Sequence, residues 1–389
     1  MARRIYFLLT TLFFFTLPLH LTNEFRIEIG KFHVTINIII LFLVFVFNFL
    51  YQKNKIINND DKSIFILFLL LIIYHIFSLL YSNELNLAYN YVVKISFAFL
   101  TFLAIYFVAN NNFFNKNFIF YFNVFAISSA MLLLYYIVQN IIRGNSFLTF
   151  NYELGWENGK NQIQFYISVV FPFFLILNLW KNKTIKIITI VINLVAIVYV
   201  GSRGLWISLV FFFIFYFKRK KKNKYSLLFV FSFILFGFIL FVNNTRNFYF
   251  FNIHHLYYKL HTLSNFNISD LSTLNILRKQ LIDSSISYFF NSPILGNGLG
   301  FFERNNFYHE LTHNDYLFFL SDLGLLGFLL FTLLIGLLYK KLYTKGLHLF
   351  LIPFLVNLLF INAYSTQIFW VLCSILLVYP KFNHKKMAK

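Results

Sequence analysis

The stretch that decides the fold is THNDYLFFLSDLGLLGFLLF, residues 312–331. Beyond its first residues it is mostly Leu and Phe, with the length and hydropathy that a membrane-spanning helix needs. Polar groups are costly in such a helix, yet it begins with His313, Asn314 and Asp315 and carries Asp322 further along. The composition of the whole chain shows whether a bilayer is the right solvent for this stretch.

The chain of 389 residues is 59% hydrophobic and 22% aromatic, only 12% charged, and has a mean hydropathy of +0.71. A soluble domain carries about 25% charged residues and could not bury so much apolar surface. We therefore predict an all-α polytopic membrane protein. The sole cysteine, Cys373, lies in an apolar run and excludes an internal disulfide.

About twelve segments are long enough to span or nearly span a bilayer. Their ranges are 5–21, 34–51, 63–82, 87–109, 118–142, 163–180, 185–201, 203–217, 225–242, 313–339, 347–361 and 364–380. Residues 1–389 are predicted to form a single membrane domain. The long loop 243–312 is rich in Tyr, Phe and Leu, so we expect it to pack against that domain.

The net charge of +20 is concentrated in the segments that would face the cytoplasm if the N-terminus is cytoplasmic. These segments carry 22 Lys and Arg against two acidic residues, Asp60 and Asp61, in the ranges 1–4, 51–62, 110–117, 181–186, 218–224, 340–346 and 381–389. Positive charge gathers on the cytoplasmic side of membrane proteins. The basic runs therefore indicate topology beside anionic lipid rather than nucleic-acid binding, with both termini cytoplasmic.

The polar head of residues 312–331 has the pattern of a capped helix start. Thr312 is predicted as the N-cap, with Asp315 completing a capping box and His313 in the first turn. The unpaired N–H groups and positive dipole there attract anions and keep the imidazole neutral. From the residues alone, a structural cap and a functional His313 both stay open.

Two glycines follow His313 by eleven and fourteen residues, Gly324 and Gly327, which places them near its helix face. Small residues let a neighbouring helix approach closely, so we predict that they form a packing face. Asp322 lies on another face, and the sequence names no partner for it.

Two of the arginines on the predicted outer side are candidates for anion binding, and the positive-inside rule disfavours the first of them, Arg203. Arg203 follows Ser202 in the sequence GSRG, residues 201–204. Arg278 and Lys279 lie in a predicted amphipathic helix, 271–290, which Pro293 ends before an irregular turn that contains Gly296, Gly298 and Gly300. Each arginine is either an interfacial or solvated residue or part of an anion clamp, since guanidinium matches phosphate oxygens.

The pattern of His-Asn, nine residues and Gly-x-x-Gly at 313–327 resembles the signature of the bacterial O-antigen ligase family, which shares a domain with many O-antigen polymerases. The family's Ser-Arg-Gly element matches residues 202–204. Its loop arginine before a Pro-x-x-Gly-x-Gly-x-Gly turn matches Arg278 and residues 293–300. The resemblance covers about residues 185–335. Many members have Trp where this chain has Ile282, and Glu is commoner at the position of Asp322.

The resemblance implies a GT-C-like, inverting membrane glycosyltransferase of lipopolysaccharide biosynthesis, in the bacterial inner membrane with its site on the periplasmic face. The donor would be a glycan on undecaprenyl pyrophosphate. The acceptor would be lipid A–core for a ligase, or another lipid-linked repeat unit for a polymerase. Neither a cofactor nor a metal is implied. A lipid-linked oligosaccharide flippase is the alternative of another class, although no repeated halves are visible.

The residue roles follow from that resemblance and from the chemistry of the side chains. Arg203 and Arg278 would stabilise the charge of the pyrophosphate. His313 would act as a general base or position a phosphate. Substrate binding is assigned to Asn314, Ser202 and Lys279, and structural roles to Thr312, Asp315, Gly324, Gly327, Pro293, Gly296 and Gly298.

Overall fold

The computed structural model describes residues 2–18, 26–29, 32–51, 57–142, 159–200, 202–220, 268–306, 314–361 and 363–379. The first part contains α1 (Ala2–Thr16), β1 (Arg26–Ile29), β2 (Phe32–Thr35), α2 (Ile36–Tyr51), η3 (Asn59–Asp61), α3 (Lys62–Ser78), α4 (Leu85–Ala109) and α5 (Asn112–Ile142). The middle contains α6 (Gly159–Leu177), α7 (Lys183–Val200) and α8 (Arg203–Lys220). The last part contains α11 (Ile268–Asn291), α12 (Phe301–Asn305), α13 (Asp315–Lys345), η5 (His348–Phe350), α14 (Leu351–Asn357) and α15 (Gln367–Val378).

Within the described residues, each predicted span is helical over most of its length, and segment 225–242 lies outside them. The described residues agree with an all-α membrane protein, with one exception that the sequence interpretation missed: β1 and β2 form an antiparallel hairpin with Arg26 opposite Thr35. Polar and apolar residues alternate along this segment, which is the period of a strand rather than of a helix.

Four helices are long and apolar enough to cross a membrane, as judged by length and composition: Asn59–Ser78, Leu85–Ala109, Asn112–Gln139 and Asp315–Lys345. The helices α14 and α15 have 7 and 12 residues. At 1.5 Å per residue they extend about 10 and 18 Å, less than the bilayer core of about 30 Å. The described residues thus support four spans, and about twelve spans stays a prediction.

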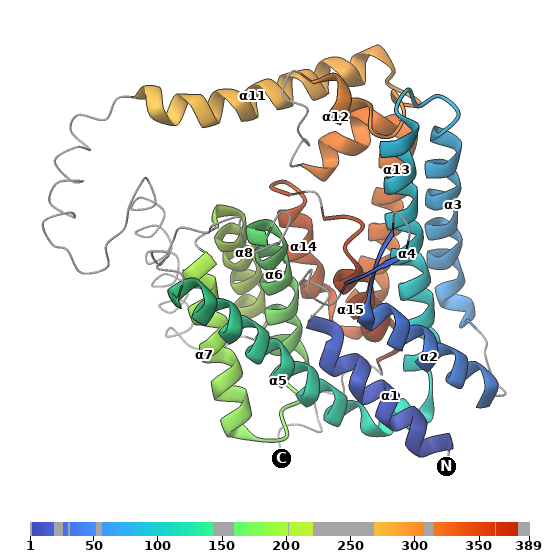
Figure 1. Ribbon diagram of the computed structural model, residues 1–389, viewed down its shortest axis with the longest axis vertical. Helices are drawn as coiled ribbons and strands as arrows, with labels where there is room; N and C mark the ends of the chain where they lie inside the picture. Colours follow the sequence, from blue (N-terminus) through green and yellow to red (C-terminus); the bar gives the residue numbers. More distant parts are fainter. Residues whose placement is uncertain are drawn as a thin grey trace, which may run out of the picture.

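The helices form a bundle in which neighbours in space are often distant in sequence (Figure 1). The helix α4 packs against α15 and α3, while α13 packs against α3, and α14 packs against α6 and α8. In this way the C-terminal helices fill the space between the first and the middle parts of the chain. The largest fully buried side chains are aromatic, with Trp370, Tyr106 and Phe68 among them.

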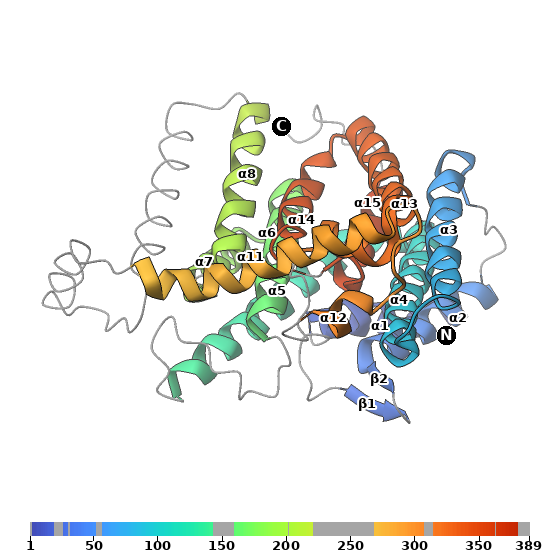
Figure 2. The ribbon, with the colours of Figure 1, turned by 90° about the horizontal axis from the view of Figure 1, so that it is seen from above.

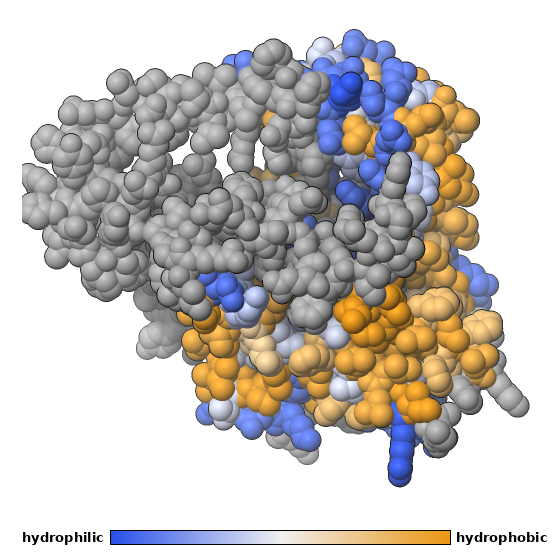
Figure 3. Space-filling view, viewed as in Figure 1, coloured by the Kyte–Doolittle hydropathy of each residue, from blue (hydrophilic) through white to orange (hydrophobic). Residues whose placement is uncertain are grey.

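Large apolar side chains remain on the outside of the long helices. They include Ile66, Leu69 and Ile73 on α3, and Leu329 and Leu333 on α13. Figure 3 shows hydrophobic residues along the side of the molecule, with hydrophilic residues gathered at its two ends. An apolar belt of this kind is costly in water and favourable against lipid tails, which agrees with a membrane protein.

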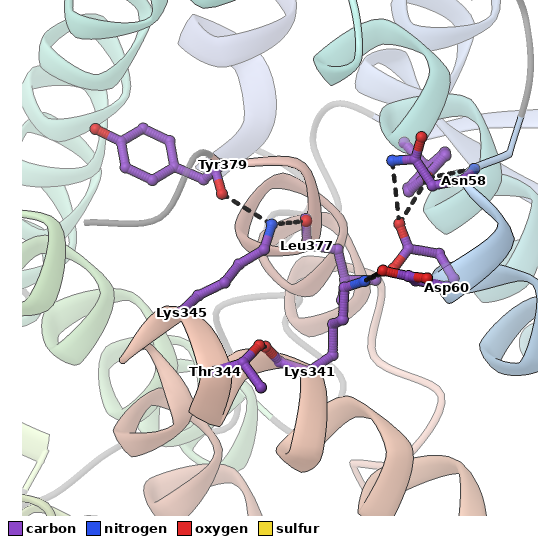
Figure 4. Close-up of polar contacts among 9 residues, drawn as sticks. Asn58, Asp60, Lys341, Thr344, Lys345, Leu377 and Tyr379 are labelled. Atoms are coloured by element: carbon purple, nitrogen blue, oxygen red, sulfur yellow. Dashed lines mark hydrogen bonds and ion pairs between the residues drawn. The ribbon is translucent and has the colours of Figure 1, made fainter. Parts of the chain in front are cut away.

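At one end of the bundle, segments that the charge pattern assigns to the cytoplasmic side lie close together. Figure 4 shows polar contacts among them. The ammonium of Lys341, on α13, lies 3.3 Å from Asp60 and 2.9 Å from Asp61. Asp61 is buried and also accepts a hydrogen bond of 2.8 Å from the hydroxyl of Tyr106. The two acidic residues of the predicted cytoplasmic segments thus pair with one of the basic residues.

The last turn of α13 is held at the same end by further basic side chains. Lys345 donates hydrogen bonds to the carbonyl oxygens of Leu377 and Tyr379. Arg219, near the end of α8, donates to the carbonyl oxygen of Gly346. Cations near the C-terminal ends of helices are favourable because the last carbonyl groups carry partial negative charge.

At the opposite end, α11 lies across the bundle rather than along it, as the two views in Figure 1 and Figure 2 show. The short α12 follows between α11 and the bundle. The helix predicted at 271–290 is confirmed as α11, and it ends at Asn291, two residues before Pro293. The described part of the long loop, 268–306, packs against α13, α3 and α4 as predicted.

The ion pair of Lys341 gives a prediction for stability. Lys341→Met removes the cation and leaves the buried carboxylate of Asp61 without it, which costs about 3 kcal/mol. We expect a lower melting temperature of the detergent-solubilised protein. The exposed neighbour Lys340 provides the control, since Lys340→Met is expected to melt as the wild type does. Equal melting temperatures for the two variants would contradict the role of the ion pair.

Candidate functional site

The start of α13 is capped by Asn314, not by Thr312. The side-chain oxygen of Asn314 accepts hydrogen bonds from the backbone N–H groups of Tyr316 (3.0 Å) and Leu317 (3.1 Å). The predicted capping box is therefore wrong by two residues, because the asparagine carbonyl reaches both unpaired N–H groups and Asn is among the best N-cap residues. Thr312 and His313 lie outside the described residues, and His313 directly precedes the N-cap in sequence.

Asp315 binds the chain that follows α14 instead of capping its own helix. Its backbone N–H donates to the carbonyl oxygen of Leu358 (2.8 Å). Its buried carboxylate accepts from the backbone N–H groups of Ala363 (2.6 Å) and Tyr364 (2.8 Å). The structural role predicted for Asp315 takes a different form, since its hydrogen bonds fix the start of α13 against residues 358–364.

A chain of buried hydrogen bonds leads from the Ser-Arg-Gly element toward the same place. The hydroxyl of Ser202 donates to the side-chain oxygen of Gln164, on α6. The amide nitrogen of Gln164 donates to the side-chain oxygen of Asn357 (3.1 Å), at the end of α14. Asn357 is the neighbour of Leu358, which accepts from the backbone of Asp315. Two motifs more than a hundred residues apart are thereby connected.

The helix α13 is held at a second place, where a break interrupts it. Gly324 has φ +62° and ψ −167°, which interrupts the helix. The N–H groups that follow the break would lack helical partners, and the turn after α11 supplies them. The N–H of Leu325 donates to the carbonyl oxygen of Pro293 (2.9 Å), and that of Leu326 to the carbonyl oxygen of Ile294 (3.2 Å).

The same turn also pairs the carbonyl groups before the break. The backbone N–H of Asn297 donates to Ser321 O (3.2 Å), and that of Gly298 donates to Asp322 O (2.9 Å). The side-chain amide of Asn297 donates to Ser321 O as well, at 2.8 Å. Residues 293–298 therefore lie at the break in α13. They form hydrogen bonds with the backbone groups of α13 both before and after Gly324.

The prediction that Gly324 forms a helix-packing face is wrong, because Gly324 contacts the inserted turn. A Cβ atom at Gly324 would lie 2.5 Å from the nitrogen of Gly296 and from the oxygen of Ile294. Gly327 does face a helix, since a Cβ atom there would lie 3.1 Å from the ring of Tyr74 on α3. Only the second glycine thus allows the close helix approach that both were predicted to allow.

Asp322 has the partners that the sequence did not reveal. Its buried carboxylate accepts hydrogen bonds from the backbone N–H groups of Gly300 (2.9 Å) and Phe302 (3.1 Å), and from the hydroxyl of Ser321 (3.1 Å). These N–H groups belong to the start of α12, so Asp322 caps α12 from another helix. It joins α12 to α13 just before the break.

The turn and α12 are also bound to the α3–α4 connection. The hydroxyl groups of Tyr74 and Tyr81 both donate to the carbonyl oxygen of Leu295, at 2.9 Å. The hydroxyl of Ser82 donates to the carbonyl oxygen of Leu299 (2.8 Å), and a Cβ atom at Gly298 would lie 2.7 Å from the Cα of Ser82. The predicted structural role of Gly298 agrees with this close backbone approach.

Charged side chains also bind α12 to α4 and to the residue before it. Tyr91, on α4, donates to the carboxylate of Glu303 (3.0 Å), and Arg304 forms an ion pair with Glu84 (3.2 Å). On the other side of the turn, Tyr288 donates to the carbonyl oxygen of Asn305 (2.7 Å). The C-terminal part of α11 is thereby fixed relative to α13 and α4.

The structure describes the backbones of two of the three predicted catalytic residues, Arg203 and Arg278. Arg203 is the first residue of α8, and Arg278 lies near the middle of α11, which crosses the bundle end above the helices (Figure 2). The side chains of both, like the whole of His313, lie outside the described residues. Lys279 is described and exposed. The roles of these residues and of Asn314 and Ser202 in binding or catalysis stay predictions.

The sequence interpretation missed two buried amides, Gln164 and Asn357, and one buried imidazole, His75. The Nδ1 of His75 lies 2.8 Å from the carbonyl oxygen of Leu71, so its Nε2 accepts from the hydroxyl of Tyr364, at 3.4 Å. The available signal was their position inside apolar helices. A buried polar side chain needs a partner there, because an unpaired one costs about 1–3 kcal/mol.

No group of three or more His, Cys, Asp or Glu side chains is placed to hold a metal ion in the part of the chain that the structure describes. The carboxylates near the site accept backbone hydrogen bonds instead, as Asp315 and Asp322 do. The described groups can hold helix ends in fixed positions, and the cationic side chains are the ones suited to bind an anion.

Residues 188–332 match the family model for O-antigen ligase. The matched range begins in α7 and ends in α13, so it contains the Ser-Arg-Gly element, α11, the inserted turn and the break at Gly324. The resemblance inferred from the sequence is confirmed for this range. None of the curated proteins that were compared with the chain matches it. Residues 188–332 of this membrane protein are thus similar to the O-antigen ligase family.

The break in α13 gives a prediction with a matched control. Gly324→Ala places a Cβ atom in the inserted turn at a positive φ, a strain of about 1–3 kcal/mol before any clash is counted. We expect a lower melting temperature. Gly336→Ala changes the same helix where an added Cβ meets nothing within 4 Å, so this variant is expected to be neutral or more stable. If both variants melted alike, the insertion would not stabilise the fold.

Proposed function

We propose that the protein is a membrane glycosyltransferase that moves a glycan from undecaprenyl pyrophosphate to an acceptor. The observation that carries the proposal is the hydrogen-bonded connection between the Ser-Arg-Gly element and the start of α13 within a chain that matches the O-antigen ligase family. In sequence, the candidate cation Arg203 directly follows Ser202 of this connection, and the candidate base His313 lies two residues before Asp315, which supports their assignment to one site.

In the proposed reaction, the acceptor hydroxyl attacks the anomeric carbon of the donor sugar. The bond from that carbon to the pyrophosphate oxygen breaks, and the pyrophosphate leaves on the carrier lipid. Attack from the opposite face inverts the anomeric centre. Arg203 and Arg278 stabilise the negative charge that develops on the leaving group, a task that preorganised cations perform well in a site of low dielectric.

His313 is the proposed general base. It takes the proton that the acceptor hydroxyl loses, a role typically worth about 10²–10⁴-fold in rate. Because Asn314 is the N-cap, His313 precedes the helix in sequence instead of belonging to its first turn, and we infer that it lies near the positive end of the helix dipole. That end favours the neutral imidazole, which is the form able to accept a proton. The second role considered for His313 is to position a phosphate.

The proposed site faces the periplasm, and both termini face the cytoplasm. The support is the distribution of charge, since the predicted cytoplasmic segments carry the whole excess of Lys and Arg over Asp and Glu. The grouping of Lys341, Lys345 and Arg219 at the end of the bundle away from α11 agrees with this assignment.

An O-antigen ligase with lipid A–core as the acceptor is the specific function that we propose. A polymerase of the same family is the second candidate, because the two share the domain that residues 188–332 match. Deletion in the native host separates them. Loss of a ligase leaves core without polymer and strands polymer on the carrier lipid, whereas loss of a polymerase leaves core with single repeat units.

The catalytic assignment is tested with His313→Ala, Arg278→Ala and Arg203→Ala. We expect each variant to insert normally and to lose transfer of polymer, because each removes a base or a cation from the reaction. Transfer is measured as surface polysaccharide in the deletion strain and as product from extracted lipid-linked glycan. The controls His348→Ala and Arg4→Ala change the same residue types at positions outside the proposed site. Normal surface polysaccharide in the three variants would overturn the assignment. If the reconstituted protein moved lipid-linked sugar across vesicle membranes without joining sugars to an acceptor, a flippase would be favoured.

Metal removal gives a separate prediction. If cationic side chains stabilise the pyrophosphate, EDTA should leave the rate of transfer by the purified protein unchanged. The measurement compares initial rates with and without EDTA, and with Mg²⁺ added back. A loss of rate that Mg²⁺ restores would show that arginines do not suffice for the leaving group.

A further inference from the structure

Both residues beside Arg203 contact one side chain, the amide of Gln164. Ser202 donates its hydroxyl hydrogen to the oxygen of that amide. A Cβ atom at Gly204 would collide with the amide nitrogen and lie 3.0 Å from the Cβ of Phe360. The serine and the glycine of the Ser-Arg-Gly element therefore have a shared structural purpose, which is to let Gln164 approach the first turn of α8.

The direction of the hydrogen bonds from Ser202 through Gln164 to Asn357 is determined at Asn357. The amide nitrogen of Asn357 donates to the carbonyl oxygen of Pro353 (2.7 Å), which can only accept. The oxygen of Asn357 must then accept from the nitrogen of Gln164. This leaves the oxygen of Gln164 facing the hydroxyl of Ser202, so all three side chains have a single orientation.

Gln164 is almost fully buried and lies in a helix whose neighbouring residues are apolar. A leucine would fill a similar volume without the cost of burying an amide. The amide is instead paired at both ends, once to the start of α8 and once to the residue before Leu358, which accepts from Asp315 at the start of α13.

We propose that Gln164, oriented by Asn357, is a positioning residue that sets the backbone of Arg203 relative to the start of α13. The proposal rests on the proposed function, because it assigns Arg203 and His313 to one reaction. Gln164 contacts neither substrate nor reacting atoms in this account. It acts through Arg203, by holding the residues on both sides of it.

A double-mutant cycle distinguishes positioning from a general structural role. Gln164→Leu keeps the volume and removes both hydrogen bonds, and Arg203→Lys keeps a cation but loses the guanidinium geometry. We expect Gln164→Leu alone to lower kcat about tenfold. In the Arg203→Lys background it should lower kcat less than twofold further, because residues that act through one group are not additive.

The assay uses full-length protein in detergent with lipid-linked glycan and lipid A–core extracted from the host. Asn193→Leu is the matched control, since Asn193 is another fully buried amide, on α7, and donates within its own helix to Thr189. We expect this variant to leave kcat within twofold of the wild type. Melting temperatures are recorded for every variant, so that a loss of fold is separated from a loss of rate.

Two further variants keep the test decisive if Gln164→Leu does not insert. Gln164→Glu retains the acceptor for Ser202 and loses the donor to Asn357, and Gly204→Ala displaces the amide from the other side. Each should show the same lack of additivity with Arg203→Lys. If the wild-type protein is active and the double variant loses kcat by the product of the two single losses, the positioning role is overturned and the proposed function stays intact. An inactive wild-type protein in this assay would overturn the proposed function itself.

Discussion

The need to pair backbone hydrogen-bonding groups in a medium without water controls the arrangement of this protein. A break in a long apolar helix leaves N–H and carbonyl groups that lipid cannot satisfy, at a cost of several kcal/mol each. In α13 the break at Gly324 is tolerated because the turn after α11 enters it and pairs with both halves. The position of α11 and α12 across the bundle end follows from that insertion, as does the requirement for glycine on both sides of the contact.

The first turns of α13 are therefore held at two points. At its start, Asn314 caps the helix and Asp315 binds residues 358–364. Ten residues later, or about 15 Å along the axis, the inserted turn holds it again. Functional groups act best when the elements that carry them have little freedom to move. The residue before the cap, His313, adjoins a helix start that is fixed in this way.

The two ends of the bundle differ in the kind of polar interaction that they contain. At one end, lysine and arginine side chains bind carboxylates and the carbonyl groups of helix ends, as Lys341 does with Asp61. At the end that α11 crosses, carboxylates such as Asp322 and Asp315 accept from backbone N–H groups. Both acids accept hydrogen bonds from two backbone N–H groups of another segment. They are structural parts of the site, while the arginines remain the groups suited to a phosphate ligand.

The sequence by itself determined the class of protein, most helix positions and the similarity of residues 188–332 to the O-antigen ligase family. Apolar periodicity, span length and charge asymmetry are local quantities, and so is the spacing of His313, Asn314, Gly324 and Gly327. Only the tertiary structure decided that Gly324 breaks its helix, that Asp322 caps α12 and that Gln164 joins Ser202 to Asn357. The reason is physical, because a buried polar group needs a partner but its own sequence neighbourhood does not specify which one. In this chain the partners lie far away in sequence, 193 residues apart for Gln164 and Asn357 and 289 residues apart for His75 and Tyr364.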